Sequence, residues 1–187
     1  MSGSAPFPPV EVELHDGRGV RLREIRPNDR EEMRQAFDRL SGESRYMRFM
    51  SHIRQLPVSM LERSVNPQRE RGLALVAEID ASDGIDIVGG ARYYILADDE
   101  TCEFAVAVAD GWRGAGLASR LMRELIAVAR DRGLRRMEGF VLAGNSGMLT
   151  LARRLGFTTE ADPHDATVRI VRIDLARAAT RAAKRPG

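Results

Sequence analysis

The chain has 187 residues, of which 43% are hydrophobic and 30% charged, a composition typical of one globular domain with a core of its own. No apolar run approaches the roughly 20 residues of a membrane span, and the first residues lack the basic and then apolar pattern of a signal peptide. The formal net charge of +2 is too small to indicate nucleic-acid binding. We therefore expect a cytoplasmic protein that binds neither membrane nor nucleic acid.

The two ends of the chain differ in composition from its middle. Residues 1–9 are rich in Ser, Gly and Pro, which predicts disorder. Residues 176–187 form a basic segment that we expect to be a flexible tail, with a partner-binding arm as the alternative. Its basic residues include Arg177, Arg181, Lys184 and Arg185. A single domain is thus predicted over residues 10–175.

The first predicted elements are a hairpin and a helix. Alternating apolar residues predict two strands within Val10–Ile25, joined by an Asp-Gly turn. Asn28, followed three residues later by Glu31, resembles a capping box and predicts the start of a helix that buries Phe37.

The next stretch is apolar but broken. Glu43–Met50 combines aromatic residues and methionines with arginines, which predicts a short helix or two, and Met60–Val65 continues as irregular structure. Packing against one sheet edge is the plainer interpretation. A lid over a substrate groove is the alternative.

Three strands are then predicted by alternation, over Gly72–Asp80, Ile87–Leu96 and Glu100–Asp110. Short turns join them, so they should form an antiparallel meander. Gly89-Gly90 indicates a bulge or a close backbone approach. A dinucleotide-binding fold would have alternated strands and helices instead.

The third of these strands leads through a glycine-rich turn into an amphipathic helix that starts at Leu117 and ends at Gly133. The first N–H groups of a helix lack intrahelical partners, and the helix dipole leaves partial positive charge there. Glycines let a phosphate approach the backbone, and Arg113 adds a cation. The turn therefore predicts a phosphate cradle, with a plain strand-to-helix turn as the alternative.

The rest of the chain completes an α/β (α+β) fold. Leu134–Leu142 follows a crossover helix, so it should lie parallel to the strand before the cradle. A short helix over Met148–Leu155 precedes a final hairpin of Phe157–Glu160 and Thr167–Leu175. We expect a mostly antiparallel mixed sheet of about seven strands with one parallel pair, flanked by helices.

Two motifs resemble the GNAT superfamily of N-acetyltransferases. Arg113-x-x-Gly116-x-Ala118 resembles the R/Q-x-x-G-x-G/A motif that cradles the pyrophosphate of acetyl-coenzyme A (acetyl-CoA). A Walker loop would need a lysine, and a dinucleotide fingerprint fails at Ser119. N-S-G-M-L-T-L-A-R-R-L-G-F, residues 145–157, resembles the segment that ends the GNAT core. The order of elements matches over Val20–Leu175, roughly four-fifths of the chain.

Three further segments resemble the acetyltransferase domain of bacterial protein lysine acetyltransferases, which act on acyl-CoA synthetases and other proteins. They are S-x-x-S-R-Y-x-R-F at residues 41–49, E-F-A-V-x-V-x-D at 103–110 and V-L-A-x-N at 141–145. Many of those enzymes carry a fused regulatory or synthetase-like domain that has no counterpart in this sequence. This difference leaves their regulation and acceptor in doubt for this chain.

The resemblance implies transfer of an acetyl group from acetyl-CoA to a primary amine, with a protein lysine as the expected acceptor, by direct attack in a ternary complex. A small-molecule amine acceptor and a non-catalytic acyl-CoA-binding module are the alternatives, and a homodimer is left open. The resemblance also implies a set of coenzyme-binding residues: Val106, Ala107, Val108, Arg113, Gly114, Ala115, Gly116, Leu117, Ala118, Ser119 and Asn145. An N-cap is the other interpretation of Asn145.

Amine acetylation needs a base, because a lysine amine with a pKa near 10.4 is almost wholly protonated at neutral pH. By the resemblance, Glu103 is that base; a solvated glutamate, or one paired with Arg92, is the alternative. Many relatives carry a tyrosine acid seven residues after the asparagine, where this chain has Ala152. The acid is therefore unassigned, with Ser146 as a weak candidate.

Other chemistries are not expected. The single cysteine, Cys102, lies on the strand face opposite the predicted base, which argues against an acyl-cysteine intermediate. We expect it to be a buried thiol. His15, His52 and His164 are far apart in sequence and show no metal-ligand spacing, so we expect surface histidines and no metal.

Overall fold

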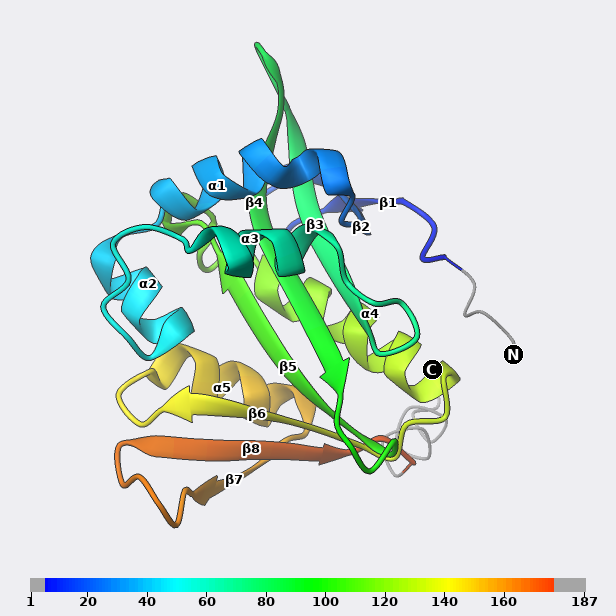
Figure 1. Ribbon diagram of the computed structural model, residues 1–187, viewed down its shortest axis with the longest axis vertical. Helices are drawn as coiled ribbons and strands as arrows, with labels where there is room; N and C mark the ends of the chain where they lie inside the picture. Colours follow the sequence, from blue (N-terminus) through cyan, green and yellow to red (C-terminus); the bar gives the residue numbers. More distant parts are fainter. Residues whose placement is uncertain (1–5, 177–187) are drawn as a thin grey trace. The chain divides into compact units, whose positions relative to one another are not determined.

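The computed structural model describes residues 6–176, and Figure 1 shows their arrangement. The strands are β1 (Val10–Glu13), β2 (Gly19–Glu24), β3 (Gly72–Ala81), β4 (Gly84–Ile95), β5 (Thr101–Val108), β6 (Arg136–Leu142), β7 (Thr158–Ala161) and β8 (Val168–Asp174). The helices are α1 (Arg30–Asp38), α2 (Gly42–Phe49), α3 (Val58–Val65), α4 (Leu117–Asp131) and α5 (Ser146–Leu155), with short 3-10 helices η1 (Pro27–Asp29) and η2 (Asp110–Trp112).

Hydrogen bonds order the strands β1-β2-β3-β4-β5-β6-β8-β7 in one mixed sheet. The β5/β6 pair is parallel, and the crossover through α4 explains why. The predicted fold class, with its one parallel pair, is confirmed. The sheet has eight strands where we expected about seven, and they correspond to the eight strand segments predicted one by one.

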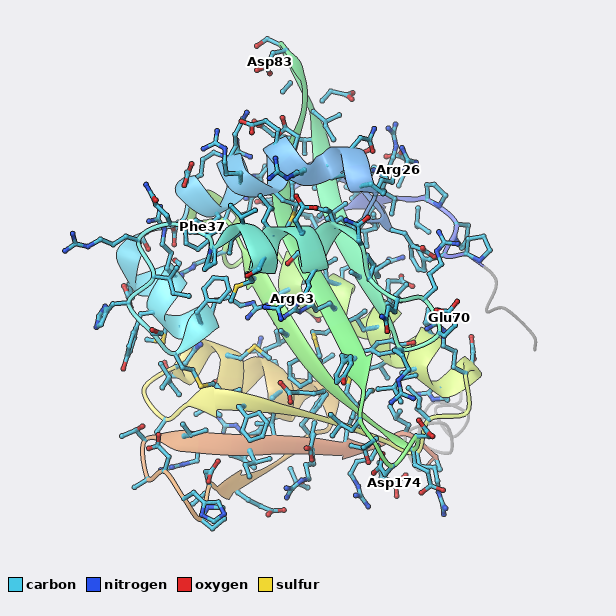
Figure 2. The ribbon with its side chains drawn as sticks, in the orientation of Figure 1. Arg26, Phe37, Arg63, Glu70, Asp83 and Asp174 are labelled. Atoms are coloured by element: carbon cyan, nitrogen blue, oxygen red, sulfur yellow. The ribbon has the colours of Figure 1, made fainter. Side chains whose placement is uncertain are left out.

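The described chain forms two compact units. The first comprises the chain up to Arg92 together with Ala105–Met122. Within it, α1 and α3 lie over the same face of β3 and β4 (Figure 1). They bury an apolar cluster of Ile25, Leu61, Val65, Ala74, Val76 and Ile87. The β3–β4 hairpin extends beyond this cluster, with Asp83 at its tip (Figure 2).

Close approach at Gly89 confirms one sequence prediction. A Cβ on Gly89 would lie 3.1 Å from the Leu117 side chain at the start of α4, and a Cβ on Gly90 would lie 3.1 Å from the Leu75 carbonyl oxygen. Helix and strands can therefore pack at this distance only because these positions lack side chains.

The second unit comprises Tyr93–Phe104 and the described chain from Arg123 onward. β6 pairs with β8 along its whole length. The ring of Phe104 lies against Gly139, where a Cβ would come within 2.6 Å of it, and contacts Phe157 edge to face with ring centroids 5.3 Å apart. This aromatic pair helps to form the core of the unit.

Two predictions about the N-terminal helices are wrong. Residues 58–65 form a regular helix, α3, because Leu61 and Val65 lie one turn apart and pack into the same cluster. The capping box uses Arg26 and Asp29 rather than Asn28 and Glu31: the Arg26 N–H donates to Asp29 Oδ2 at 2.7 Å. The carboxylate of the predicted box, on Glu31, lies two residues after the carboxylate that forms the observed box, on Asp29.

The structure describes only part of the two chain ends. Residues 6–9 carry no regular structure. Residues 1–5 and 177–187, including Arg177, Arg181, Lys184 and Arg185, lie outside the described residues, so the predictions of a disordered start and a basic tail are not tested. Between residues 6 and 176, no helix has the length and apolarity that crossing a bilayer requires.

Candidate functional site

The predicted phosphate cradle is a turn between η2 and α4, in the first unit. Gly114 and Gly116 adopt φ values of +77° and +91°, in the left-handed region that favours glycine. Helix α4 begins directly after them, at Leu117. Its first N–H groups have no carbonyl one turn back in the helix, which is the reason why helix starts can bind anions. Ala115 and Leu117 are buried, so they anchor the turn to the rest of the first unit.

The loop between β1 and β2 supports this turn. The His15 N–H donates to the Ala115 carbonyl at 3.1 Å, and the His15 ring lies where a side chain on Gly116 would stand. Arg18 donates from Nη1 to the Gly111 carbonyl at 3.0 Å and stacks on Trp112, 3.9 Å from the ring centroid. His15 is exposed, as predicted, but its contact with the cradle was not.

Helix α2 supports the turn from another direction, through Asp110. The Asp110 carboxylate accepts hydrogen bonds from the Ser41 N–H at 2.8 Å and the Ser44 hydroxyl at 2.5 Å. Arg113 Nη2 donates to Ser44 Oγ at 2.5 Å and lies 3.2 Å from Asp110 Oδ1. We call these four residues, Ser41, Ser44, Asp110 and Arg113, the α2 junction.

The α2 junction also sets the charge of its carboxylate. Burial alone would raise the pKa of Asp110, but hydrogen bonds from Ser44 and Ser41 and the charge of Arg113 outweigh it and lower the pKa from 3.8. Asp110 is therefore ionised throughout the neutral range. Its lowered pKa makes the junction stabilising above about pH 4, and this contribution is lost as the pH falls through the pKa of the folded state.

An open pocket of about 130 Å³ lies in the first unit. Its walls are apolar side chains of α1, α2 and α3, including Phe37, Phe49 and Met60, and its floor includes Ala105 and Ala107 of β5. Phe37, labelled in Figure 2, meets Phe49 edge to face with ring centroids 5.7 Å apart. Residues 43–65, predicted to be either packing or a lid, thus form part of a pocket wall.

The predicted base, Glu103, belongs to the second unit and is exposed. Its partner in the parallel β5/β6 register is Glu138. Glu138 accepts a hydrogen bond from Arg172 Nε at 2.9 Å, and Arg172 Nη1 donates to Glu160 at 2.9 Å. The cation of Arg172 therefore offsets the negative charge beside Glu103.

Asn145 also belongs to the second unit, where it caps α5. Its side-chain oxygen accepts the Met148 N–H at 3.1 Å, so the N-cap interpretation is confirmed. A coenzyme-binding role for Asn145 stays a prediction. Ala152, at the position of the tyrosine in many relatives, is fully buried and carries no group that could donate a proton.

The prediction of a buried thiol is confirmed. Cys102 is buried, and burial raises the pKa of its thiol to about 12, so the thiolate nucleophile is not formed near neutral pH. Over residues 6–176, the side chains of His, Cys, Asp and Glu form no group of three or more that could hold a metal ion.

Sequence reasoning missed the residues that hold the cradle in place. Ser41, Ser44 and Asp110 stand within segments that carry the family resemblance, yet no role was assigned to them. Arg18 and His15 precede the cradle by about a hundred residues in sequence. These contacts could have been predicted only with knowledge of which loops meet at the start of α4.

Comparisons with known proteins show the family to which the chain belongs. Residues 32–157 match the acetyltransferase (GNAT) family. The chain is 37% identical to acetyltransferase PA5475 of Pseudomonas aeruginosa, over 93% of this chain and 96% of that protein. It is also 33% identical, over 54% of this chain and 61% of the relative, to an L-methionine sulfoximine/L-methionine sulfone acetyltransferase of the same species.

Solved structures show the same fold. The GNAT domain of S. lividans PAT is 27% identical, with a TM-score of 0.82 over 90% of this chain and 99% of that domain. The yncA protein of Salmonella typhimurium, a putative acetyltransferase solved with its cofactor acetyl-CoA, has a TM-score of 0.61 at 19% identity over 83% of this chain and 94% of its own.

Proposed function

Because the chain belongs to the acetyltransferase (GNAT) family and is an N-acetyltransferase, we propose that it transfers the acetyl group of acetyl-CoA to the side-chain amine of a protein lysine. The observation that carries the proposal is the turn from Arg113 to Ser119. Two left-handed glycines expose its backbone at a helix start, and a guanidinium stands beside it. This combination suits the pyrophosphate of the coenzyme.

The end of β5 supports a place for the pantetheine arm. The register of β5 with β6 covers Thr101–Glu103, whereas β5 itself continues to Val108. The main-chain groups of Val106 and Val108 thus lie beyond the residues of β5 that pair with β6. They can pair with the amides of the arm as they would with a neighbouring strand. A backbone N–H there would also stabilise the thioester oxygen as negative charge develops.

The pocket supports a lysine acceptor. Its apolar lining suits the methylenes of a lysine side chain, which are apolar up to the terminal amine. Ala105 and Ala107, which contribute to its floor, alternate along β5 with the same period as Glu103, so all three share one face of that strand. In this proposal Glu103 receives the proton of the amine.

The step is a direct transfer. The neutral amine attacks the thioester carbon, the C–N bond forms, and the C–S bond breaks. The amine proton goes to Glu103 and the electron pair leaves on the coenzyme A sulfur. A thiol of ordinary pKa, about 8.5, can leave as thiolate and take a proton from solvent, so the absence of a tyrosine at Ala152 does not prevent the reaction.

A small amine is the second candidate acceptor. What favours it is the similarity to the relative named for L-methionine sulfoximine and L-methionine sulfone. The pocket of about 130 Å³ is lined partly by arginines, Arg48 and Arg92, which could meet a carboxylate. For either acceptor we propose the cytoplasm as the compartment, which suits a chain with one cysteine.

The test is acetyl transfer by the wild-type protein and by Glu103→Gln. Acetyl-CoA is supplied with two acceptor panels, lysine-containing peptides and free amino acids, and both released thiol and acetylated product are measured. We expect product on peptide lysines, and a loss of about 10²-fold or more in the Glu103→Gln rate with coenzyme affinity unchanged.

Glu13→Gln is the matched control, because Glu13 is another exposed strand glutamate, on β1. It should retain the wild-type rate. Product on free amino acids but not on peptides would favour the second candidate. An unchanged rate in Glu103→Gln would remove Glu103 as the base, and coenzyme binding without any transfer would favour a sensing module.

A further inference from the structure

We propose that Asp110 and Ser44 are positioning residues that orient Arg113 for the coenzyme and, through the same contacts, couple coenzyme binding to helix α2 and thereby to the wall of the acceptor pocket. This inference rests on the proposed function, because it takes Arg113 as a phosphate-binding residue. It adds to that function a link between the two substrate sites within the first unit.

The first part of the argument is the geometry of the α2 junction. Asp110 begins η2 and Arg113 begins the cradle directly after it, whereas Ser41 and Ser44 are the N-cap and third residue of α2. The two parts are more than 60 residues apart in sequence. Ser44 is 6% exposed, and its hydroxyl both donates to Asp110 and accepts from Arg113. These contacts fix its orientation.

The second part is the set of donors on Arg113. Both of its contacts use Nη2, and a guanidinium carries further donors on Nε and Nη1. The side chain is 51% exposed, so these donors can meet a phosphate while Nη2 keeps its contacts with Ser44 and Asp110. The junction therefore holds the guanidinium in one orientation before the coenzyme binds, which reduces the entropy lost on binding.

The third part is the far end of α2. The helix is eight residues long, and its last two residues, Arg48 and Phe49, line the pocket. Arg45 ties the middle of the same helix to the end of α1 by donating to the carbonyls of Phe37 and Asp38. One short helix thus has its first turn on the coenzyme cradle and its last turn on the acceptor pocket.

Coupling follows from these contacts. A phosphate that fixes Arg113 also fixes Ser44, and with it the start of α2. By linkage, whatever stabilises α2 in its docked position favours coenzyme binding by the same factor. Acetyl-CoA and an acceptor held by the pocket wall should therefore each strengthen the binding of the other.

The test measures two quantities on wild type, Asp110→Asn and Ser44→Ala: the affinity for coenzyme A by calorimetry, and amide hydrogen exchange of Gly42–Phe49 with and without saturating coenzyme A. In the wild type we expect saturating coenzyme A to slow exchange in α2 several-fold. In both variants the affinity should fall about tenfold, as for loss of one hydrogen bond to a charged group. The coenzyme-dependent slowing in α2 should be lost even at saturation.

Ser44→Ala separates positioning from a purely structural role. It leaves the Ser41–Asp110 contact in place, so exchange in α2 without coenzyme should stay near the wild-type rate. Asp165→Asn is the matched control, because Asp165 likewise accepts hydrogen bonds from a backbone N–H and a hydroxyl, both of Thr167, but lies in the second unit. It should behave as wild type.

Two results would overturn the inference. One is tight coenzyme A binding by the wild type without any change of exchange in α2. The other is a wild-type exchange response in Asp110→Asn and Ser44→Ala. Failure of the wild type to bind coenzyme A would instead overturn the proposed function itself, and the inference with it.

Discussion

At the level of single residues, Gly116 meets the strictest requirement of the cradle. Its φ of +91° is costly for any residue with a side chain. A Cβ there would also lie 2.9 Å from the ring of His15, and His15 belongs to the loop that supports the turn. Backbone conformation and space therefore both require glycine at this position.

We expect Gly116→Ala to weaken coenzyme A binding by tenfold or more, about 1.4 kcal/mol, because the clash displaces the turn that presents the backbone N–H groups. Calorimetric titration measures the affinity. Urea unfolding should show a loss of about 1–2 kcal/mol from backbone strain.

Gly133→Ala provides the control for strain. Gly133 follows the end of α4 with a φ of +80°, and a Cβ there would meet nothing within 4 Å. It should lose a similar amount of stability and keep its affinity for coenzyme A. Equal affinity losses in the two variants would mean that strain alone, rather than the contact with His15, affects the cradle.

At the level of elements, a buried ion-pair cluster joins β2, η1 and β3. Arg23, 3% exposed, donates to both oxygens of Asp29 at 2.7 and 2.8 Å and to Glu78 at 2.6 Å. Asp29 and Glu78 are buried as well. Asp29 also caps η1 through the Arg26 N–H, so the same carboxylate positions the start of α1, which lines the pocket.

Arg23→Met should therefore lower the free energy of unfolding by about 3–5 kcal/mol, because it removes the buried cation that Asp29 and Glu78 share. Arg21→Met is the control on the same strand. Arg21 is 45% exposed, pairs with Glu11 at the surface and reaches Glu78 only at 3.4 Å, so its loss should cost less, about 1 kcal/mol. Urea unfolding measures the loss of stability in both variants. If the two variants lost similar amounts, burial would not be the reason that the Arg23 ion pairs matter.

At the level of the whole molecule, the coenzyme should stabilise the fold. A ligand at 100 times its dissociation constant adds about 2.7 kcal/mol, which for a chain of this size corresponds to roughly 5–10 °C in Tm. We expect this shift with acetyl-CoA and with coenzyme A but not with NADH or ATP. A shift with NADH or ATP alone would show that the turn from Arg113 to Ser119 accepts another ligand.

Much of the fold could be predicted because its signals are local. The alternation in β5, the change of period at Leu117 and the stop at Gly133 placed a strand, a turn and a helix within a few residues of their observed limits. The parallel β5/β6 pair followed from the crossover rule. The helix at Val58–Val65 was missed because it is only eight residues long, and because it packs against Ala74 and Val76, which the local sequence does not reveal.

In the candidate site, too, only the features that lie within one short segment could be predicted from the sequence. The glycines and Arg113 were predicted because their chemistry lies in one short segment. The contacts that hold them come from residues distant in sequence, such as Ser44 and Arg18, and each depends on tertiary packing. Asp110 is an example: the sequence shows that it belongs to a motif, but not that its hydrogen-bond partners lie on α2.

The cradle also carries the only tryptophan of the chain. Trp112 lies within η2, half-buried, with the guanidinium of Arg18 over its ring. Its fluorescence therefore originates from a single place, one residue before Arg113. Without any added label, the wild-type protein should report by its own emission when a ligand reaches this turn, and how fast it arrives and leaves.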